Sequence, residues 1–163
     1  MGTLEDLFRL NAFHCIPGWG RYWLHASLEK KEYYTFTAAV PFLLGHIPLL
    51  LATFPVFFSV SFMASLGDAS ASFFGKRFGK HLLPNSPRKT WEGTLSGTLV
   101  TLATTLLWGL IFHPQQIAVC IVFAGLLAGL FSLFDALNHT IDDNFINTFV
   151  IGAIAWGLYV LLF

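Results

Sequence analysis

Carboxylate side chains at two places in the chain could take part in catalysis or bind a metal ion. Asp68 lies within an otherwise apolar stretch, and an unpaired charge in hydrocarbon costs on the order of 3 kcal/mol. Ser72 follows four residues later and therefore shares a helix face with Asp68. The second group begins at Asp135, and three residues on its helix face follow at offsets of three, four and seven: Asn138, His139 and Asp142. Asp143 comes directly after them.

Between these two groups lies a cationic segment. It holds five of the nine lysine and arginine residues of the chain: Lys76, Arg77, Lys80, Arg88 and Lys89. Gly75 and Gly79 would let backbone N–H groups approach an anion, and the cations would neutralise a phosphate. The spacing is not that of a P-loop, because the two glycines are one residue too close and His81 replaces the magnesium-binding hydroxyl. The alternative is a basic loop attracted to anionic lipid, but the glycines and Glu92 favour a phosphate site.

Carboxylates that face a cationic segment are typical of a magnesium ion bound together with a polyphosphate. Magnesium usually takes one or two protein carboxylates and completes its shell with phosphate oxygens and water. The carboxylates that could serve as ligands are Asp68, Glu92, Asp135, Asp142 and Asp143. For the last two, a polar turn that ends a helix is the alternative interpretation.

The elements that must position these residues are membrane helices. Hydrophobic residues make up 55% of the 163 residues and charged residues only 11%, whereas soluble domains carry about 25% charged residues. Uncharged runs of 35, 42 and 20 residues span positions 33–67, 93–134 and 144–163, and about 20 residues suffice to cross a bilayer. These runs exclude a soluble enzyme, a disordered chain and a nucleic-acid binder. The chain is predicted to be an all-α integral membrane protein.

Proline and polar interruptions divide the apolar runs into about five transmembrane helices, predicted over 36–53, 56–75, 93–112, 117–137 and 145–162. Residues 1–32 are predicted to form a short cytoplasmic or interfacial segment, and 33–163 the transmembrane catalytic domain. With five spans, all the basic residues near the helices fall on one side, which the positive-inside rule assigns to the cytoplasm. Gly93 with Gly97, and Gly125 with Gly129, have the spacing of helix-packing glycines.

Three short segments, 67–71, 75–80 and 89–93, together resemble the CTP-dependent polyprenol kinase family. That family groups dolichol kinase, phytol kinase and a CTP-dependent diacylglycerol kinase, and it is related to phosphatidate cytidylyltransferase. Residues 142–145 resemble its late Asp-Asn element, and Asp135 stands where a Glu is common. Full-length relatives usually carry further transmembrane helices before this point, including an Arg-Lys and His element that is not found here, and the proline that often follows the Asp-Asn element is missing. The chain also lacks the His-Gly-Gly with a later Asp-Arg pair that marks the cytidylyltransferases, which favours a kinase.

The resemblance implies transfer of the γ-phosphate of CTP to a membrane lipid alcohol such as a polyprenol, phytol or diacylglycerol, with Mg²⁺ as cofactor. Phosphoryl transfer relies mainly on positioning and charge neutralisation, which suits the residues above. The expected phosphate-binding residues are Lys76, Arg77, Lys80 and Lys89, with Gly75 and Gly79. The expected catalytic carboxylates are Asp68, Asp142 and Asp143. The site should face the cytoplasm, in a bacterial inner membrane or, in a eukaryote, the endoplasmic reticulum.

Three alternatives remain open. A cytidylyltransferase would make a CDP-lipid from a phosphatidic acid and release pyrophosphate. A transporter would need an ion path across the membrane, and the concentration of charge at one face argues against it. A non-catalytic membrane relative of these enzymes is the third. No nucleic acid is expected as a partner, and the sequence leaves a homo-oligomer open.

Overall fold

The computed structural model describes residues 39–84, 86, 89–137 and 145–163 of the chain. The described part is built from helices, with one isolated β-bridge between Leu82 and Thr90. The predicted N-terminal segment 1–32 and the candidate ligands Asp142 and Asp143 lie outside the described residues. Within the described part, the prediction of an all-α architecture is confirmed.

Three helices in the described part are long and apolar enough to cross a membrane. The first runs from Phe54 to Phe78 and consists of α4 (Phe54–Phe62), the π-helical turn η4 (Met63–Gly67) and α5 (Asp68–Phe78). The others are α6 (Trp91–Phe112) and α7 (Ile117–Ala136). At about 1.5 Å per residue, each of the three reaches the roughly 30 Å thickness of the hydrocarbon core. The chain is a membrane protein.

Two shorter apolar helical segments complete the described bundle. The C-terminal one, η5 (Ile146–Val150) with α9 (Ile151–Leu162), falls within the predicted range. The N-terminal one differs from the single helix predicted over 36–53. There α3 (Ala39–His46) ends and the 3₁₀ turn η3 (Pro48–Leu51) follows. The α-helix stops here because proline has no N–H to donate to the preceding turn.

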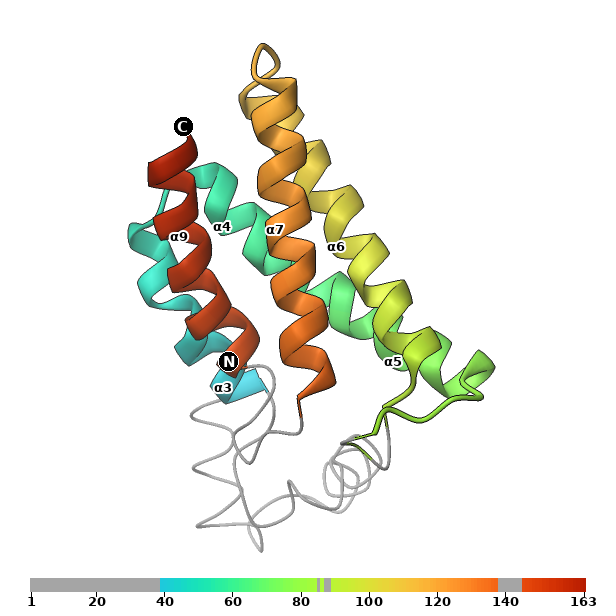
Figure 1. Cartoon of the computed structure of the whole chain (residues 1–163). Helices are drawn as coiled ribbons and strands as arrows, with labels where there is room; N and C mark the ends of the chain where they lie inside the picture. Colours follow the sequence, from blue (N-terminus) through green and yellow to red (C-terminus); the bar gives the residue numbers. More distant parts are fainter. Residues whose placement is uncertain (1–38, 85, 87–88, 138–144) are drawn as a thin grey trace, which may run out of the picture.

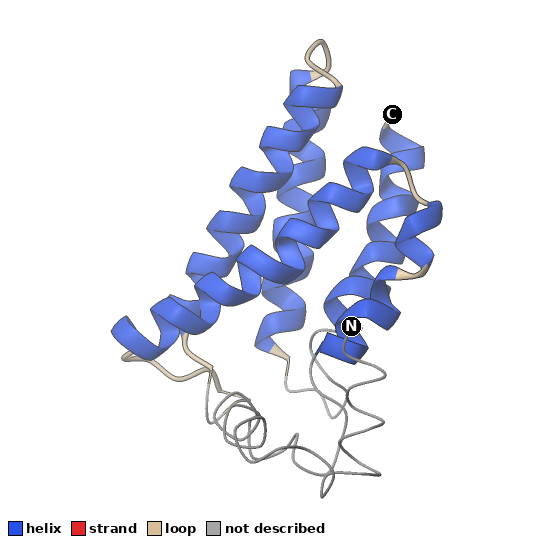
Figure 2. Ribbon diagram, turned by 180° about the vertical axis from the view of Figure 1, so that it is seen from behind, coloured by secondary structure: helices blue, strands red, loops and turns tan. Residues whose placement is uncertain are grey.

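The helices are arranged in two groups joined by the long α4–α5 helix. Helices α6 and α7 run side by side, and α3 and α9 lie together beside them. The α4–α5 helix crosses obliquely, behind the bundle in Figure 1 and in front of it in Figure 2. Helix α4 contacts α9, and α5 contacts α6. The core lies where these elements meet, and its largest fully buried side chains are Phe123, Phe131, Met63, Leu127, Ile151, Val56 and Val60.

Small residues let α5 and α6 approach closely. A Cβ atom added at Gly93 would lie 2.7 Å from the carbonyl oxygen of Ala71, and one added at Gly97 would lie 2.8 Å from that of Gly67. The predicted packing role of Gly93 and Gly97 is therefore confirmed. The same prediction is wrong for Gly125 and Gly129 within the described chain, because no heavy atom lies within 4 Å of a Cβ added at either.

The π-helical turn η4 directly precedes Asp68. A π-helical turn contains one residue more than an α-helical turn and is frequent near functional sites. Residues on the two sides of η4 therefore do not share the helix faces that a count of 3.6 residues per turn would give them. In a regular α-helix, Ala64 and Ala71 would lie on the same face as Asp68, whereas the pocket described below is lined by Ala71 but not by Ala64.

Candidate active site

The cationic segment between α5 and α6 folds back on itself. The backbone N–H of Leu83 donates to the carbonyl oxygen of Lys89 at 2.9 Å, and that of Trp91 donates to the carbonyl oxygen of His81 at 3.0 Å. The Leu82–Thr90 bridge lies between these two bonds. Leu83 is buried and anchors the segment. The segment is thus a hairpin-like loop that gives Lys89 a defined place, which the sequence did not predict.

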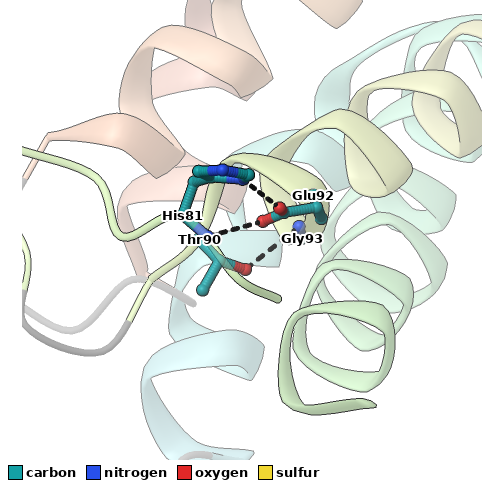
Figure 3. Close-up of polar contacts among 4 residues, drawn as sticks. All are labelled: His81, Thr90, Glu92 and Gly93. Carbon is teal, nitrogen blue, oxygen red and sulfur yellow. Dashed lines mark hydrogen bonds and ion pairs between the residues drawn. The ribbon is translucent and has the colours of Figure 1, made fainter. Parts of the chain in front are cut away.

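Thr90 caps the start of α6. Its Oγ1 atom accepts a hydrogen bond from the backbone N–H of Gly93 at 3.2 Å (Figure 3). A threonine in this position satisfies one of the free N–H groups at a helix start and stabilises the helix by about 1 kcal/mol. The cap also fixes the direction in which the preceding residue, Lys89, enters the site.

A pocket of about 280 Å³ opens between one side of α5, the start of α6 and the end of α7. This volume is close to the lower end of small-molecule sites, roughly 300 Å³. Its charged lining residues come from three separate parts of the sequence. The lining residues are Asp68, Ala71, Ser72, Gly75, Lys76, Lys89, Thr90, Gly93, Thr94 and Asp135. Two carboxylates and two lysines therefore share one hollow at one end of the helix bundle.

Asp135 is the most buried of these charged groups, with 7% of its surface exposed. One of its carboxylate oxygens lies 3.1 Å from the Nζ atom of Lys89. Its other oxygen accepts a hydrogen bond from the hydroxyl of Thr94. A buried carboxylate is tolerated only when it is paired and hydrogen-bonded, and both conditions are met here. The contacts link the end of α7 to the start of α6.

The structure separates the predicted site residues into two sets. Asp68, Gly75, Lys76, Lys89 and Asp135 line the pocket. The other described candidates do not line it: Arg77, Gly79, Lys80 and Glu92.

Glu92 faces His81 instead of the pocket. The Nδ1 atom of His81 lies 2.7 Å from one carboxylate oxygen of Glu92, and the backbone N–H of His81 donates to the other at 3.4 Å (Figure 3). These contacts close the hairpin-like loop against the first turn of α6. Glu92 therefore stabilises the loop from outside the pocket.

The residues that line the pocket fit one mode of magnesium binding. Among the described residues, no group of three His, Cys, Asp or Glu side chains comes together that could hold a metal ion. Magnesium bound with a polyphosphate needs only one or two carboxylates, and Asp68 and Asp135 supply two at the pocket wall. A magnesium–nucleotide complex fits this donor set better than a metal held by protein ligands alone.

Comparison with known proteins gives one match. A family model described as the cytidylyltransferase family matches residues 25–138, well over half of the chain. The chain belongs to the cytidylyltransferase family. No curated protein and no solved structure matches it.

Membership of the cytidylyltransferase family makes this chain a transferase-type membrane enzyme related to CDP-lipid transferases and lipid kinases. The matched range includes all four charged residues of the pocket and ends before Asp142 and Asp143.

Two pocket residues were missed by the sequence prediction, Thr90 and Thr94. Both are uncharged, and threonine is common in apolar helices, so neither stood out. One signal was present: Thr94 follows Thr90 by four residues, which places both on one side of the first turn of α6. The contact between Thr94 and Asp135 joins residues 41 positions apart, and no local pattern indicates such a pairing.

Proposed function

We propose that this protein transfers the γ-phosphate of CTP to the hydroxyl group of a membrane lipid alcohol, such as a polyprenol, phytol or diacylglycerol. The observation that carries the proposal is the charge of the pocket. Its walls hold Lys76, Lys89, Asp68 and Asp135, and the formal charges of these four side chains cancel. A phosphatidic acid acceptor would bring a second phosphate beside the triphosphate and would require further cations. A lipid alcohol brings no charge.

In this proposal each pocket residue has a defined part. Lys76 and Lys89 neutralise the phosphates of CTP, and the helix start capped by Thr90 favours negative charge near it. Asp68 and Asp135 would bind the Mg²⁺ ion that accompanies the nucleotide, and Asp142 and Asp143 are further candidate ligands. The bound ion would supply positive charge for the phosphate oxygens. Arg77, Lys80 and Glu92 have no direct part.

The reaction needs only one proton transfer. The lipid oxygen forms a bond to the γ-phosphorus as the bond from that phosphorus to the β–γ bridging oxygen breaks, and CDP leaves. The proton of the lipid hydroxyl passes to a carboxylate at the pocket, for which Asp68 is the least buried described candidate. Catalysis then rests on positioning and charge neutralisation, as is usual for phosphoryl transfer.

Cytidylyl transfer to a phosphatidic acid is the second candidate, and the family match favours it directly. In that reaction the lipid phosphate attacks the α-phosphorus of CTP and pyrophosphate leaves. The same lysines would then contact the departing phosphates. The two reactions differ in which part of CTP reaches the lipid.

Two labelled nucleotides distinguish the candidates. Purified protein in mixed micelles with Mg²⁺ would receive CTP labelled at the γ-phosphate or at the α-phosphate, together with lipid alcohols or phosphatidic acid. We expect γ-label in the lipid fraction with an alcohol acceptor and no transfer of α-label. Transfer of α-label to phosphatidic acid would establish the second candidate instead. No transfer of either label, with CTP still bound, would identify a non-catalytic relative.

A further inference from the structure

Five exposed side chains that neighbour the pocket-lining residues Lys76 and Thr90 in the fold form a surface that the proposed reaction does not use. We call it the headgroup patch, and it consists of Arg77, Phe78, Lys80, Leu82 and Trp91. Its three apolar members are largely uncovered: Phe78 is 52% exposed, Leu82 60% and Trp91 55%. Neither of its cations lines the pocket.

The members of the patch lie close together along the backbone, around the contact between Gly79 and Thr90. The end of α5 meets the hairpin-like loop where Gly79 faces Thr90, and a Cβ added at Gly79 would lie 2.6 Å from the Oγ1 atom of Thr90. Phe78 precedes Gly79, Trp91 follows Thr90, and Leu82 is the bridge partner of Thr90. The three apolar side chains therefore extend from neighbouring points of the backbone.

The position of the patch along the bundle indicates what covers it. The helix from Phe54 to Phe78 has 25 residues and is roughly 37 Å long, whereas the hydrocarbon core is about 30 Å thick. A helix of this length reaches the headgroup layer at any tilt up to about 35°. Exposed Phe73 and Phe74 continue the apolar surface of the helix up to the patch. The ring of Phe74 stacks on the ring of Phe78, with centroids 5.7 Å apart, so the exposed aromatic side chains of α5 reach the patch.

The chemistry of the patch fits this layer. The guanidinium carbon of Arg77 lies 5.7 Å from the ring centroid of Phe78, so a cation and an aromatic ring share one site. Aromatic rings and long basic side chains are the residue types that anchor proteins at the membrane–water interface. Basic residues there attract anionic lipids.

We propose that the headgroup patch inserts into the headgroup layer of anionic phospholipids. Phe78, Leu82 and Trp91 reach the boundary with the acyl chains, and Arg77 and Lys80 bind lipid phosphates. The insertion holds the pocket at the depth of the lipid headgroups, where the reacting group of a lipid substrate lies. This inference holds for either candidate reaction, because both use a lipid acceptor from the same layer.

Depth measurements by spin labelling test the proposal without any assay of activity. Single cysteines replace Leu82, Leu99 or Gln115 in a Cys15→Ser, Cys120→Ser background, and the labelled proteins are placed in nanodiscs with and without phosphatidylglycerol. Leu99 on α6 is 56% exposed and serves as the hydrocarbon reference, and Gln115 in the opposite loop as the aqueous reference. We expect the accessibility of the Leu82 label to oxygen and to a nickel chelate to lie between the values of the two references. Phosphatidylglycerol should move this label deeper into the bilayer.

A charge variant tests the role of the cations. The double variant Arg77→Gln/Lys80→Gln should abolish the shift caused by phosphatidylglycerol, whereas Lys30→Gln/Lys31→Gln, which also removes two charges, should retain it. A Leu82 label that matches Gln115 in every lipid would overturn the proposal. The proposal would also be overturned if the depth of the Leu82 label changed neither with phosphatidylglycerol nor in the double variant. A label shielded from both reagents only at high protein-to-lipid ratio would assign the patch to a second copy of the chain instead.

Discussion

At the scale of single residues, the most constrained side chain is Asp135. It is buried, and its two oxygens contact Lys89 from the loop and Thr94 from the first turn of α6. Removing one member of such a pair leaves the other without compensation, which costs more than the pair contributes. Asp135 therefore has a structural task in addition to its proposed part in nucleotide binding.

We expect Asp135→Asn to lower the free energy of unfolding by about 1–3 kcal/mol, because Lys89 loses its counter-charge while remaining partly exposed to solvent. Lys89→Gln alone should also destabilise, since it leaves the buried carboxylate unpaired. The double variant should cost less than the sum of the two single changes. Denaturant unfolding in detergent measures all three. Strict additivity would show that the ion pair is not formed in solution.

Asp68 belongs to the pocket without the burial of Asp135, so its removal should affect binding and not folding. We expect Asp68→Asn to reduce turnover by orders of magnitude and to weaken the magnesium-dependent thermal stabilisation by CTP, since a ligand stabilises the folded state only as far as it binds. The melting temperature without nucleotide should remain near that of the wild type, and a chelator should remove the CTP effect from the wild type.

Glu92→Gln provides the contrast to Asp68→Asn. Glu92 is engaged by His81 outside the pocket, so this variant should keep the CTP-dependent stabilisation. Equal loss in both variants would place Glu92 at the nucleotide and contradict the described geometry.

The sequence identified which residue types would gather, but it did not identify all of their partners. Asp68, Asp135 and the cationic segment fall near helix ends that the predicted topology places on one side, so their meeting could be predicted from the apolar runs alone. Lys76 and Arg77 are adjacent in sequence, and only the packing of α5 decides that Lys76 lines the pocket. The contacts of Lys89 and Glu92 depend on the hairpin-like loop, which has no regular sequence pattern.

At the scale of elements, the apolar runs predicted the long helices to within a few residues, because lipid requires every backbone group to be paired within a helix. The exception was the first segment, where Pro48 divides one predicted helix into α3 and η3. The π-helical turn η4 was not predictable, since neither its composition nor its periodicity differs from that of an α-helix.

Gly97 and Gly125 belong to glycine pairs of the same spacing, but their substitution by alanine should affect stability differently. In Gly97→Ala the new methyl group would lie 2.8 Å from the carbonyl oxygen of Gly67 and 2.5 Å from the ring of Phe131. We expect α6 to move away from η4 and α7, at a cost of about 1–3 kcal/mol. Gly125→Ala meets no atom of the described chain within 4 Å and should leave the stability of the purified protein unchanged. Thermal unfolding of both variants measures the difference, and similar losses would contradict the described packing of α6 against η4 and α7.

At the scale of the whole molecule, the pocket and the loop between α6 and α7 lie at opposite ends of the bundle (Figure 1). If the bundle spans the membrane with the pocket in the cytoplasm, the two ends meet different solutions. Single cysteines at Lys80 and Gln115 should then show opposite reactivity toward an impermeant thiol reagent in intact cells, with only Gln115→Cys labelled from outside. Labelling of both positions from outside would reject this orientation.

The π-helical turn η4 is the place where the long helix holds one residue more than a regular α-helix needs. Because the wide turn absorbs that residue, deleting one residue from Met63–Gly67 should restore a regular α-helix and leave Asp68 and α4 on their present faces. Leu66 is 46% exposed, and CTP with magnesium should still stabilise a variant that lacks it. Deletion of the exposed Ala69 from the regular helix α5 removes about 100° of rotation between Asp68 and Lys76, so those two residues could no longer line the same pocket and the stabilisation by CTP should be lost. Thermal unfolding of both deletion variants with CTP and magnesium measures this contrast, and equal losses would show that the wide turn does not absorb a residue.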